Sequence, residues 1–199
     1  MTQTILTAWI MLFALQLSGS ANAQTIHATE WKTLSGHSDD VNLVAFSPDG
    51  KLLASSYEKD SVIKLWFVET GEEIRTLNGH SEGVKSIAFS SDGKLLASGS
   101  RDATVKLWSV ETGQEIRTLR AHTRWIHGIA LSPDGKIIAS GSGDTTIKLW
   151  SVETGREIGT LRGHSEPVQW VAFSPGGRLL ASGSRDKTVK LWKLECKTE

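Results

Sequence analysis

Short apolar runs separated by polar turns fill residues 30–194. In one stretch these runs cover 84–90, 94–99, 104–110 and 115–119, and they are rich in Val, Ile, Leu and Phe. The residues between them are mostly Gly, Asp, Ser and Pro, which favour turns. Runs of this length between turns are typical of β-strands, and no apolar period of 3.6 residues persists long enough to predict a helix. The pattern therefore predicts an all-β fold built from antiparallel hairpins.

The same pattern recurs four times along the chain. Three residue types mark the copies at steps of 42 residues, with one step of 43: His37, His80, His122 and His164; Asp60, Asp102, Asp144 and Asp186; Trp66, Trp108, Trp150 and Trp192. Residues 80–121 and 122–163 are identical at 26 of 42 positions. The extra residue of the first copy falls within 55–60, at a turn, where loops tolerate insertions. The chain therefore contains four copies of one structural unit.

Each copy has Gly-His or Ala-His near one end and Leu-Trp at the other. With a period of about 42 residues, this arrangement resembles the WD40 repeat. The repeats cover about 30–68, 72–110, 114–152 and 156–194. The Asp that gives the family its name is absent after each Trp, where the chain has Phe67, Ser109, Ser151 or Lys193. The resemblance implies a β-propeller of four blades, each a sheet of four antiparallel strands.

The first residues of the repeat region match an outer strand of the later copies, because Glu30–Leu34 aligns with Glu73–Leu77. In WD40 propellers such a strand completes the last blade and closes the ring. The sequence favours a closed four-bladed ring in one chain, sealed by residues 30–34. The alternative is half of an eight-bladed ring, in which two chains form a homodimer and each supplies the other's missing strand.

One polar set could be mistaken for a catalytic site. His80, Ser98 and Asp102 are the residue types of a Ser-His-Asp hydrolase, but equivalent sets recur in the other copies, and catalysis needs one preorganised site. In WD40 proteins the matching positions form a buried hydrogen-bond chain of Trp, Ser, His and Asp, which fixes the turns of each blade. The resemblance implies this structural role for four tetrads: His37, Asp60 and Trp66 with Ser55 or Ser56; His80, Ser98, Asp102 and Trp108; His122, Ser140, Asp144 and Trp150; His164, Ser182, Asp186 and Trp192.

Nearly identical repeats are expected to differ where they bind a partner. In WD40 proteins, partner contacts concentrate on a face that corresponds here to the third and fifth residues after each His and the residue before each Asp. These residues are Asp40, Asn42 and Lys59; Gly83, Lys85 and Arg101; Trp125, His127 and Gly143; Pro167, Gln169 and Arg185. Four of the twelve are Lys or Arg, which favours an acidic or phosphorylated protein or peptide as the partner.

Two tryptophans lie outside the repeated set. Trp125 is the candidate anchor of the binding face, since Trp and Arg dominate binding hot spots; the alternative is that it packs on the loop of its neighbour. Trp170 lies in the last repeat, where the other copies have Leu43, Ser86 and Gly128. We expect Trp170 to fill the seam at which the ring closes.

The first 23 residues differ from the repeats because they contain no Lys, Arg, Asp or Glu. Their apolar run, residues 5–17, is shorter than the roughly 20 residues that a membrane-spanning helix needs. It is followed by Ala21-Asn22-Ala23, which fits the small-x-small pattern of signal peptidase sites. We expect a signal peptide over 1–23, a linker over 24–29 and a tail over 195–199. Cleavage would give an exported protein, periplasmic or secreted, without a membrane span, whereas an uncleaved leader would anchor the protein to the membrane.

Composition argues against several classes of function and site. The 22 Lys and Arg balance 22 Asp and Glu, so no broad basic surface for nucleic acid is expected. The single cysteine, Cys196, excludes an intramolecular disulfide and a Cys-based zinc site. The remaining histidines, His27 and His127, lack carboxylates at ligand spacing, and no phosphate-binding motif is present, so neither a metal nor a cofactor is expected.

These observations predict a non-catalytic scaffold that presents one propeller face to a protein or peptide. Two alternatives stay open. One is a propeller enzyme with a site at the axis, for which only Asp40 and His127 come near a suitable cluster. The other is a repeat fragment that completes a larger propeller by assembly.

Overall fold

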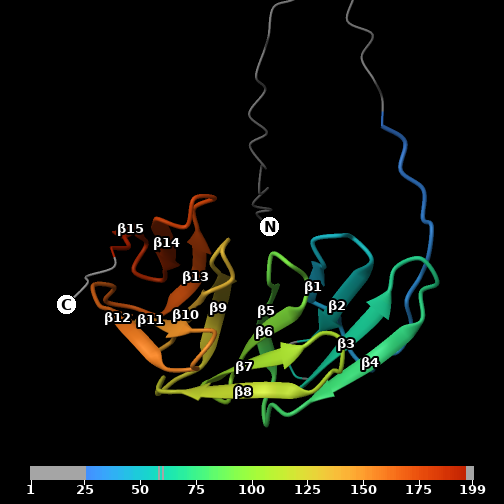
Figure 1. Ribbon diagram of the computed structural model, residues 1–199, viewed down its shortest axis with the longest axis horizontal. Helices are drawn as coiled ribbons and strands as arrows, with labels where there is room; N and C mark the ends of the chain where they lie inside the picture. Colours follow the sequence, from blue (N-terminus) through green and yellow to red (C-terminus); the bar gives the residue numbers. More distant parts are fainter. Residues whose placement is uncertain (1–25, 58, 60, 196–199) are drawn as a thin grey trace, which may run out of the picture. The chain divides into compact units, whose positions relative to one another are not determined.

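A computed structural model describes residues 26–57, 59 and 61–195 of this chain, and all regular elements in this part are β-strands (Figure 1). Fifteen strands form four antiparallel sheets, and within each sheet neighbouring strands are consecutive along the chain. The strands belong to one compact unit, Lys32–Glu199, and the described residues before Lys32 belong to a separate unit. The all-β prediction with sheets of antiparallel strands is confirmed.

The sheets have nearly the same strand lengths, as expected for repeats. The first contains β1 (Leu43–Phe46), β2 (Leu52–Ser56), β3 (Val62–Phe67) and β4 (Glu73–Asn78). The second contains β5 (Val84–Phe89), β6 (Leu95–Ser100), β7 (Thr104–Ser109) and β8 (Glu115–Arg120). The third contains β9 (Ile126–Leu131), β10 (Ile137–Ser142), β11 (Ile147–Ser151) and β12 (Glu157–Leu161). The fourth contains β13 (Val168–Phe173), β14 (Leu179–Ser184) and β15 (Val189–Lys193).

The turn between β5 and β6 shows why the sequence reverses where it does. The Asp92 carboxylate accepts hydrogen bonds from the Ser90 hydroxyl, at 2.6 Å, and from the Lys94 N–H, at 3.0 Å. Gly93 adopts φ of 70°, in the left-handed region that glycine enters without steric cost. This combination holds the two strands in register, and the corresponding Asp and Gly recur in the first and third sheets.

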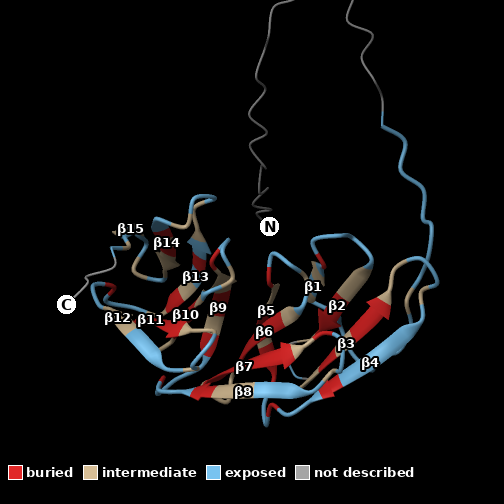
Figure 2. Cartoon of the chain, viewed as in Figure 1, coloured by how far each residue is buried: buried red, intermediate tan, exposed pale blue. Residues whose placement is uncertain are grey.

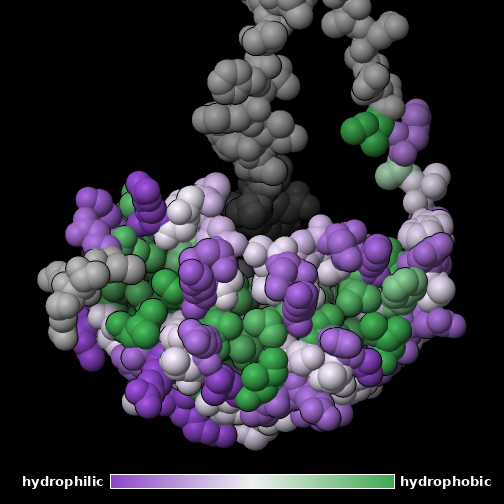
Figure 3. Space-filling view, in the orientation of Figure 1, coloured by the Kyte–Doolittle hydropathy of each residue, from purple (hydrophilic) through white to green (hydrophobic). Residues whose placement is uncertain are grey.

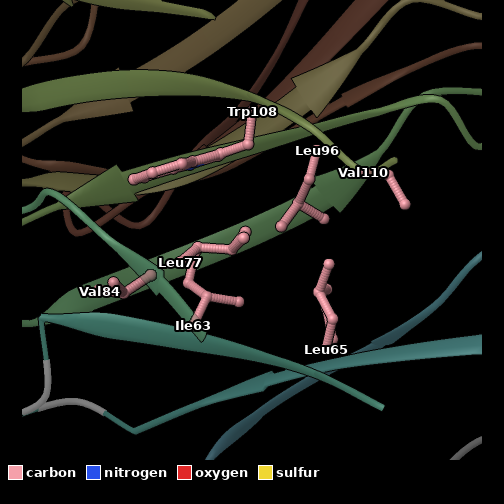
Figure 4. Close-up of a cluster of buried hydrophobic side chains, with 8 residues drawn as sticks. Ile63, Leu65, Leu77, Val84, Leu96, Trp108 and Val110 are labelled. Carbon is pink, nitrogen blue, oxygen red and sulfur yellow. The ribbon is translucent and has the colours of Figure 1, made fainter. Parts of the chain in front are cut away.

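The hydrophobic core lies between consecutive sheets. Figure 4 shows the first of its clusters, in which Ile63, Leu65 and Leu77 of the first sheet meet side chains of the second. Trp108 lies in this cluster and is 1% exposed. The outer strands β4, β8 and β12 carry most of the exposed positions, whereas the middle strands of the second and third sheets are buried (Figure 2). Burial between sheets, rather than within one, therefore holds the four repeats together.

The predicted closing strand is not formed. Residues 30–34 are in no strand, and β15 pairs only with β14 among the described residues, so the fourth sheet has three strands instead of the predicted four. The sheets follow one another in a row, with β1, β5, β9 and β13 along the same side (Figure 1). Residues 32–36 have no β15 beside them, because they lie along the first sheet at the opposite end of this row. The predicted signal peptide, the start of the linker and residues 196–199 of the tail lie outside the described residues.

Candidate functional site

A buried hydrogen-bond chain links three segments of the second repeat. His80, which precedes β5, joins the Asp102 carboxylate through Nδ1 at 2.8 Å and the Ser98 hydroxyl through Nε2 at 2.7 Å. The Trp108 indole Nε1–H of β7 donates to the same Ser98 oxygen at 2.8 Å. Asp102 stands in the turn between β6 and β7, so the chain of contacts fixes this turn against the segment that enters the sheet.

The later repeats have the same tetrad. His122 joins Asp144 at 2.7 Å and Ser140 at 2.8 Å, and His164 joins Asp186 and Ser182 at the same two distances. Trp150 and Trp192 donate to Ser140 and Ser182.

In the first repeat, His37 and Trp66 both contact the Ser55 hydroxyl, at 2.7 and 2.6 Å. Ser56 instead donates to the Val62 carbonyl, so Ser55 is the hydroxyl of the first set. Asp60 lies outside the described residues.

The tetrad aspartates have lowered pKa values. Burial raises the pKa of Asp102, but hydrogen bonds from His80, the Thr104 hydroxyl and the Ser81 N–H outweigh it and hold the pKa well below its usual range. The pKa of Asp144 is lowered in the same way, through His122 and Thr146. These carboxylates therefore stay ionised at neutral pH and act as permanent acceptors.

The tetrad hydroxyls cannot serve a hydrolase. Ser98 and Ser140 are 0% exposed, and Ser182 is 2% exposed. A catalytic serine must reach the carbonyl of a substrate, which a fully buried hydroxyl cannot do. The geometry of the repeated set is therefore that of a buried structural network.

The exposed face carries three adjoining pockets, with volumes of about 580, 300 and 240 Å³. Arg101 lines the first and third, and Trp125 lines the first and second, so the pockets form one connected surface, which we call the variable face. Eleven of the twelve residues predicted for the binding face line at least one of these pockets: Asp40, Asn42, Lys59, Lys85, Arg101, Trp125, His127, Gly143, Pro167, Gln169 and Arg185. Asp40 lines the third pocket, whereas His127 lines the first and second.

Backbone hydrogen bonds bring these positions together in each of the last three repeats. The Arg101 N–H donates to the Gly83 carbonyl at 2.9 Å, and the Gly143 N–H donates to the Trp125 carbonyl at 2.9 Å. The Arg185 N–H donates to the Pro167 carbonyl at 3.0 Å. The third residue after each His is thus tied to the residue before each Asp. The backbone geometry is therefore the same in these repeats, each of which has the buried tetrad, while the side chains at these exposed positions differ from repeat to repeat.

Trp125 lies across the boundary between two repeats. The Arg101 guanidinium of the preceding repeat sits 4.7 Å from the centre of its ring, and the His127 ring packs edge-on with its centre 6.3 Å from that of the indole. Trp125 nevertheless remains 46% exposed. It therefore both packs on the loop of its neighbour and leaves an aromatic surface open to the largest pocket of the variable face.

The pockets also include residues that the sequence did not predict for this face. Glu82 and Arg124 line the first pocket, Asp39 and Tyr57 line the third, and Trp170 lines the second. Glu82, Arg124 and Asp39 share one signal, because each is the second residue after a tetrad His, a position at which the copies also differ. In the second pocket, the Gln169 side-chain Nε2 is buried and has no hydrogen-bond partner among the described residues.

Residues 26–57, 59 and 61–195 contain no group of three or more His, Cys, Asp or Glu side chains placed to hold a metal ion. A helix with the length and apolar character needed to cross a membrane was not found in this part of the chain either.

Comparison with known proteins identifies the repeats. The family model for the WD domain, G-beta repeat, matches residues 29–66, 71–109, 113–151 and 155–193. The solved structure of U3-55K superposes with a TM-score of 0.76 at 29% sequence identity. That match covers 82% of this chain and 51% of the other, so this chain spans about half the length of its structural relative. No curated protein sequence matches the chain.

Proposed function

Since this chain belongs to the WD40 repeat family, we propose that it is a non-catalytic scaffold that binds a protein or peptide on its variable face. Domains of this family typically serve as protein-interaction scaffolds. The observation that carries the proposal is the half-exposed Trp125, held beside Arg101 at the largest pocket of a surface that differs from repeat to repeat. Large aromatic side chains next to arginine supply much of the binding energy in protein interfaces.

We propose that the partner offers acidic or phosphorylated groups beside an apolar side chain. Five cationic side chains line the three pockets: Lys59, Lys85, Arg101, Arg124 and Arg185. The acidic side chains there are Asp39, Asp40, Glu82 and Asp102, and since Asp102 is bound within the buried tetrad, the cationic ones are in excess. Cations spread around a contact mainly speed association and make it sensitive to salt, whereas the aromatic ring contributes desolvated contact area. The Gln169 amide adds a donor in the second pocket.

Replacing Trp125 with Ala is expected to weaken capture of the partner by roughly 2 kcal/mol, or about 30-fold in Kd, without lowering the melting temperature. The ring is exposed enough that its loss should cost little stability, but it lines both larger pockets. The measurement is affinity capture from an extract of the host, followed by titration of the proteins retained. Ile158→Ala is the matched control, because Ile158 is an apolar side chain, 54% exposed, that lines none of these three pockets.

The proposal fails if the wild type, Trp125→Ala and Ile158→Ala capture the same proteins in equal amounts. A second variant, with Arg101 and Arg185 both changed to Glu, is expected to slow association and flatten its dependence on salt. Binding that keeps its rate and salt response in this variant would place the partner on another surface.

We also propose that the protein is exported, on the strength of residues 1–23. The intact mass of the protein recovered from its host is expected to correspond to a chain that begins at Gln24. Replacing Ala23 with a bulky residue should block cleavage, because signal peptidase requires a small residue there, whereas the same change at Asn22 should not. Recovery of the unprocessed wild-type chain would argue instead for a membrane-anchored protein.

A further inference from the structure

The two sheets at the ends of the row expose apolar faces whose equivalents at the inner boundaries are buried or half-buried. On the first sheet this end face consists of Val41, Val44 and Phe46, which are 46%, 65% and 63% exposed. The equivalents of Val41 in the later repeats, Val84, Ile126 and Val168, are 0% exposed.

On the fourth sheet the opposite end face consists of Leu179, Val189 and Leu191, at 42%, 74% and 72% exposure. The equivalents of Leu191 in the earlier repeats, Leu65, Leu107 and Leu149, are 0%, 2% and 8% exposed. Hydrophobic side chains are exposed over this sheet in the view of Figure 3.

The inner boundaries show what covers such faces. In each of them, residues equivalent to the end face of the fourth sheet pack against residues equivalent to the end face of the first. Between the second and third sheets, for example, Val105 and Leu107 share a cluster with Ile126 and Ile129. The two exposed faces are therefore equivalent to the two sides of an inner boundary and are expected to fit each other.

A glycine series points to the same pairing. A Cβ on Gly99 would meet the Ile126 side chain at 2.5 Å, and a Cβ on Gly141 would meet Val168 at 2.7 Å, so each glycine makes room for the β-branched residue of the next sheet. Gly183, the third member, has nothing within 4 Å, and Val41 is the matching β-branched residue of the first sheet.

Residues 32–36 occupy the place of an outer strand that belongs to a preceding sheet. Lys32 Nζ donates to the Glu69 carbonyl of the first sheet, just as Arg117 donates to the Glu153 carbonyl of the third at 2.6 Å. Gly36 lies against the ring of Trp66, as Gly79 lies against that of Trp108. Residues 32–36 thus lie where the outer strand of a preceding sheet would lie. Among the described residues, the three other strands of such a sheet are not beside them.

Ion pairs between neighbouring strands indicate which strand residues 30–34 would join. The Lys on each third strand pairs with the Glu that begins the adjacent outer strand: Lys64 with Glu73, Lys106 with Glu115 and Lys148 with Glu157. The fourth such lysine, Lys190 of β15, has no ion pair among the described residues, and β15 has no outer neighbour there. In the sequence Glu30-Trp-Lys-Thr-Leu34, Glu30 is the residue at the matching position.

We propose that two copies of this chain join head to tail into one eight-bladed ring. The end face of each first sheet covers the end face of the other copy's fourth sheet, and residues 30–34 of each copy add the missing outer strand to β15 of the other. Two such contacts related by a twofold axis leave neither an uncovered apolar end face nor a sheet that lacks its outer strand. A ring of eight blades lies within the range of known propellers. Each copy has the spacing of blades found in a chain about twice as long, since it superposes on half of the U3-55K chain.

The first test is the mass of the protein in solution, expressed from its full sequence and measured by sedimentation equilibrium. The expected mass is that of two chains. Changing Val189 and Leu191 together to Lys should reduce it to one chain, while the circular dichroism spectrum stays unchanged because both side chains are exposed in a single copy. Ile116→Lys is the control, since Ile116 is 45% exposed on an outer strand, and this variant should keep the mass of two chains. A wild type that sediments as one chain or as an open polymer would overturn the proposal.

The second test separates the dimer from a ring closed within one chain. Lys64, Lys106 and Lys148 stand opposite Thr76, Thr118 and Thr160, so Lys190 should stand opposite Thr33 of the other copy. A chain with Thr33→Cys, Lys190→Cys and Cys196→Ser, treated with a short thiol cross-linker, should run as two chains on a denaturing gel. A chain with Thr112→Cys in place of Thr33→Cys should not cross-link. Cross-linking confined to one chain, or none in the first variant, would refute the paired ring.

Discussion

Replacing Trp108 with Ala is expected to lower the free energy of unfolding by about 3–5 kcal/mol. The indole is 1% exposed and lies in the cluster between the first and second sheets. Its far edge reaches Gly79, where an added Cβ would stand 2.9 Å from the ring. Truncation would leave a cavity at this boundary and would free the Ser98 hydroxyl of its indole donor. Urea unfolding followed by circular dichroism, at one fixed protein concentration, measures the change.

Two variants make this result interpretable. Trp108→Phe keeps most of the ring but removes the Nε1–H, so it should cost much less than Trp108→Ala. Trp125→Ala removes the same side chain from a surface position that is 46% exposed, and its effect on unfolding should be small. If Trp108→Ala and Trp125→Ala destabilised the protein equally, the boundary between sheets would not be the source of its stability.

Most of the scaffold could be predicted from the sequence because repetition restricts the interpretation. A single Ser, His and Asp could belong to many sites, but the same spacing in successive copies indicates one role that every copy needs. The strands expected at 84–90, 94–99, 104–110 and 115–119 match β5 to β8 within about two residues. Their ends are set by local turn chemistry, such as the Asp92 turn, which a short stretch of sequence contains in full.

Closure of the ring could not be predicted in the same way. Residues 30–34 match the outer strands, yet the match does not say whose β15 they join, because one register serves the same chain or a second copy. Which of the two forms depends on the curvature of the whole row of sheets, a property that no local pattern contains. Trp170 illustrates the difference: we expected it to fill the closing seam, and in the single chain it is 67% exposed.

That the variable positions share one surface could be predicted from the sequence for a related reason. Positions that differ while their neighbours stay constant pointed to Arg101, Trp125 and Arg185, and the structure places these side chains around one pocket. The contact between Arg101 and the Trp125 ring joins side chains of two repeats, so it depends on how closely the sheets stand. The distance between the Arg101 guanidinium and the Trp125 ring cannot be predicted from residue spacing within one repeat.

Replacing Asp102 with Ala is expected to cost roughly 1–3 kcal/mol of the free energy of unfolding. The carboxylate accepts hydrogen bonds from His80 Nδ1, from the Ser81 N–H and from both the N–H and hydroxyl of Thr104. Its side chain is 8% exposed, so water cannot replace it fully, and the buried His80 nitrogen would lose its strongest partner. Leaving buried donors unsatisfied is more costly than the net value of the bonds themselves.

Asp92 is the matched control for this prediction, since it is also a turn aspartate in the second repeat and also accepts from a hydroxyl and a backbone N–H. It is exposed, so water can take over both hydrogen bonds when Asp92 is changed to Ala. That change should therefore stay within about 0.5 kcal/mol, as most surface substitutions do. Urea unfolding of the two variants under identical conditions makes the comparison. Because the two aspartates differ mainly in burial, equal destabilisation would mean that the buried chain of hydrogen bonds does not hold the turn between β6 and β7.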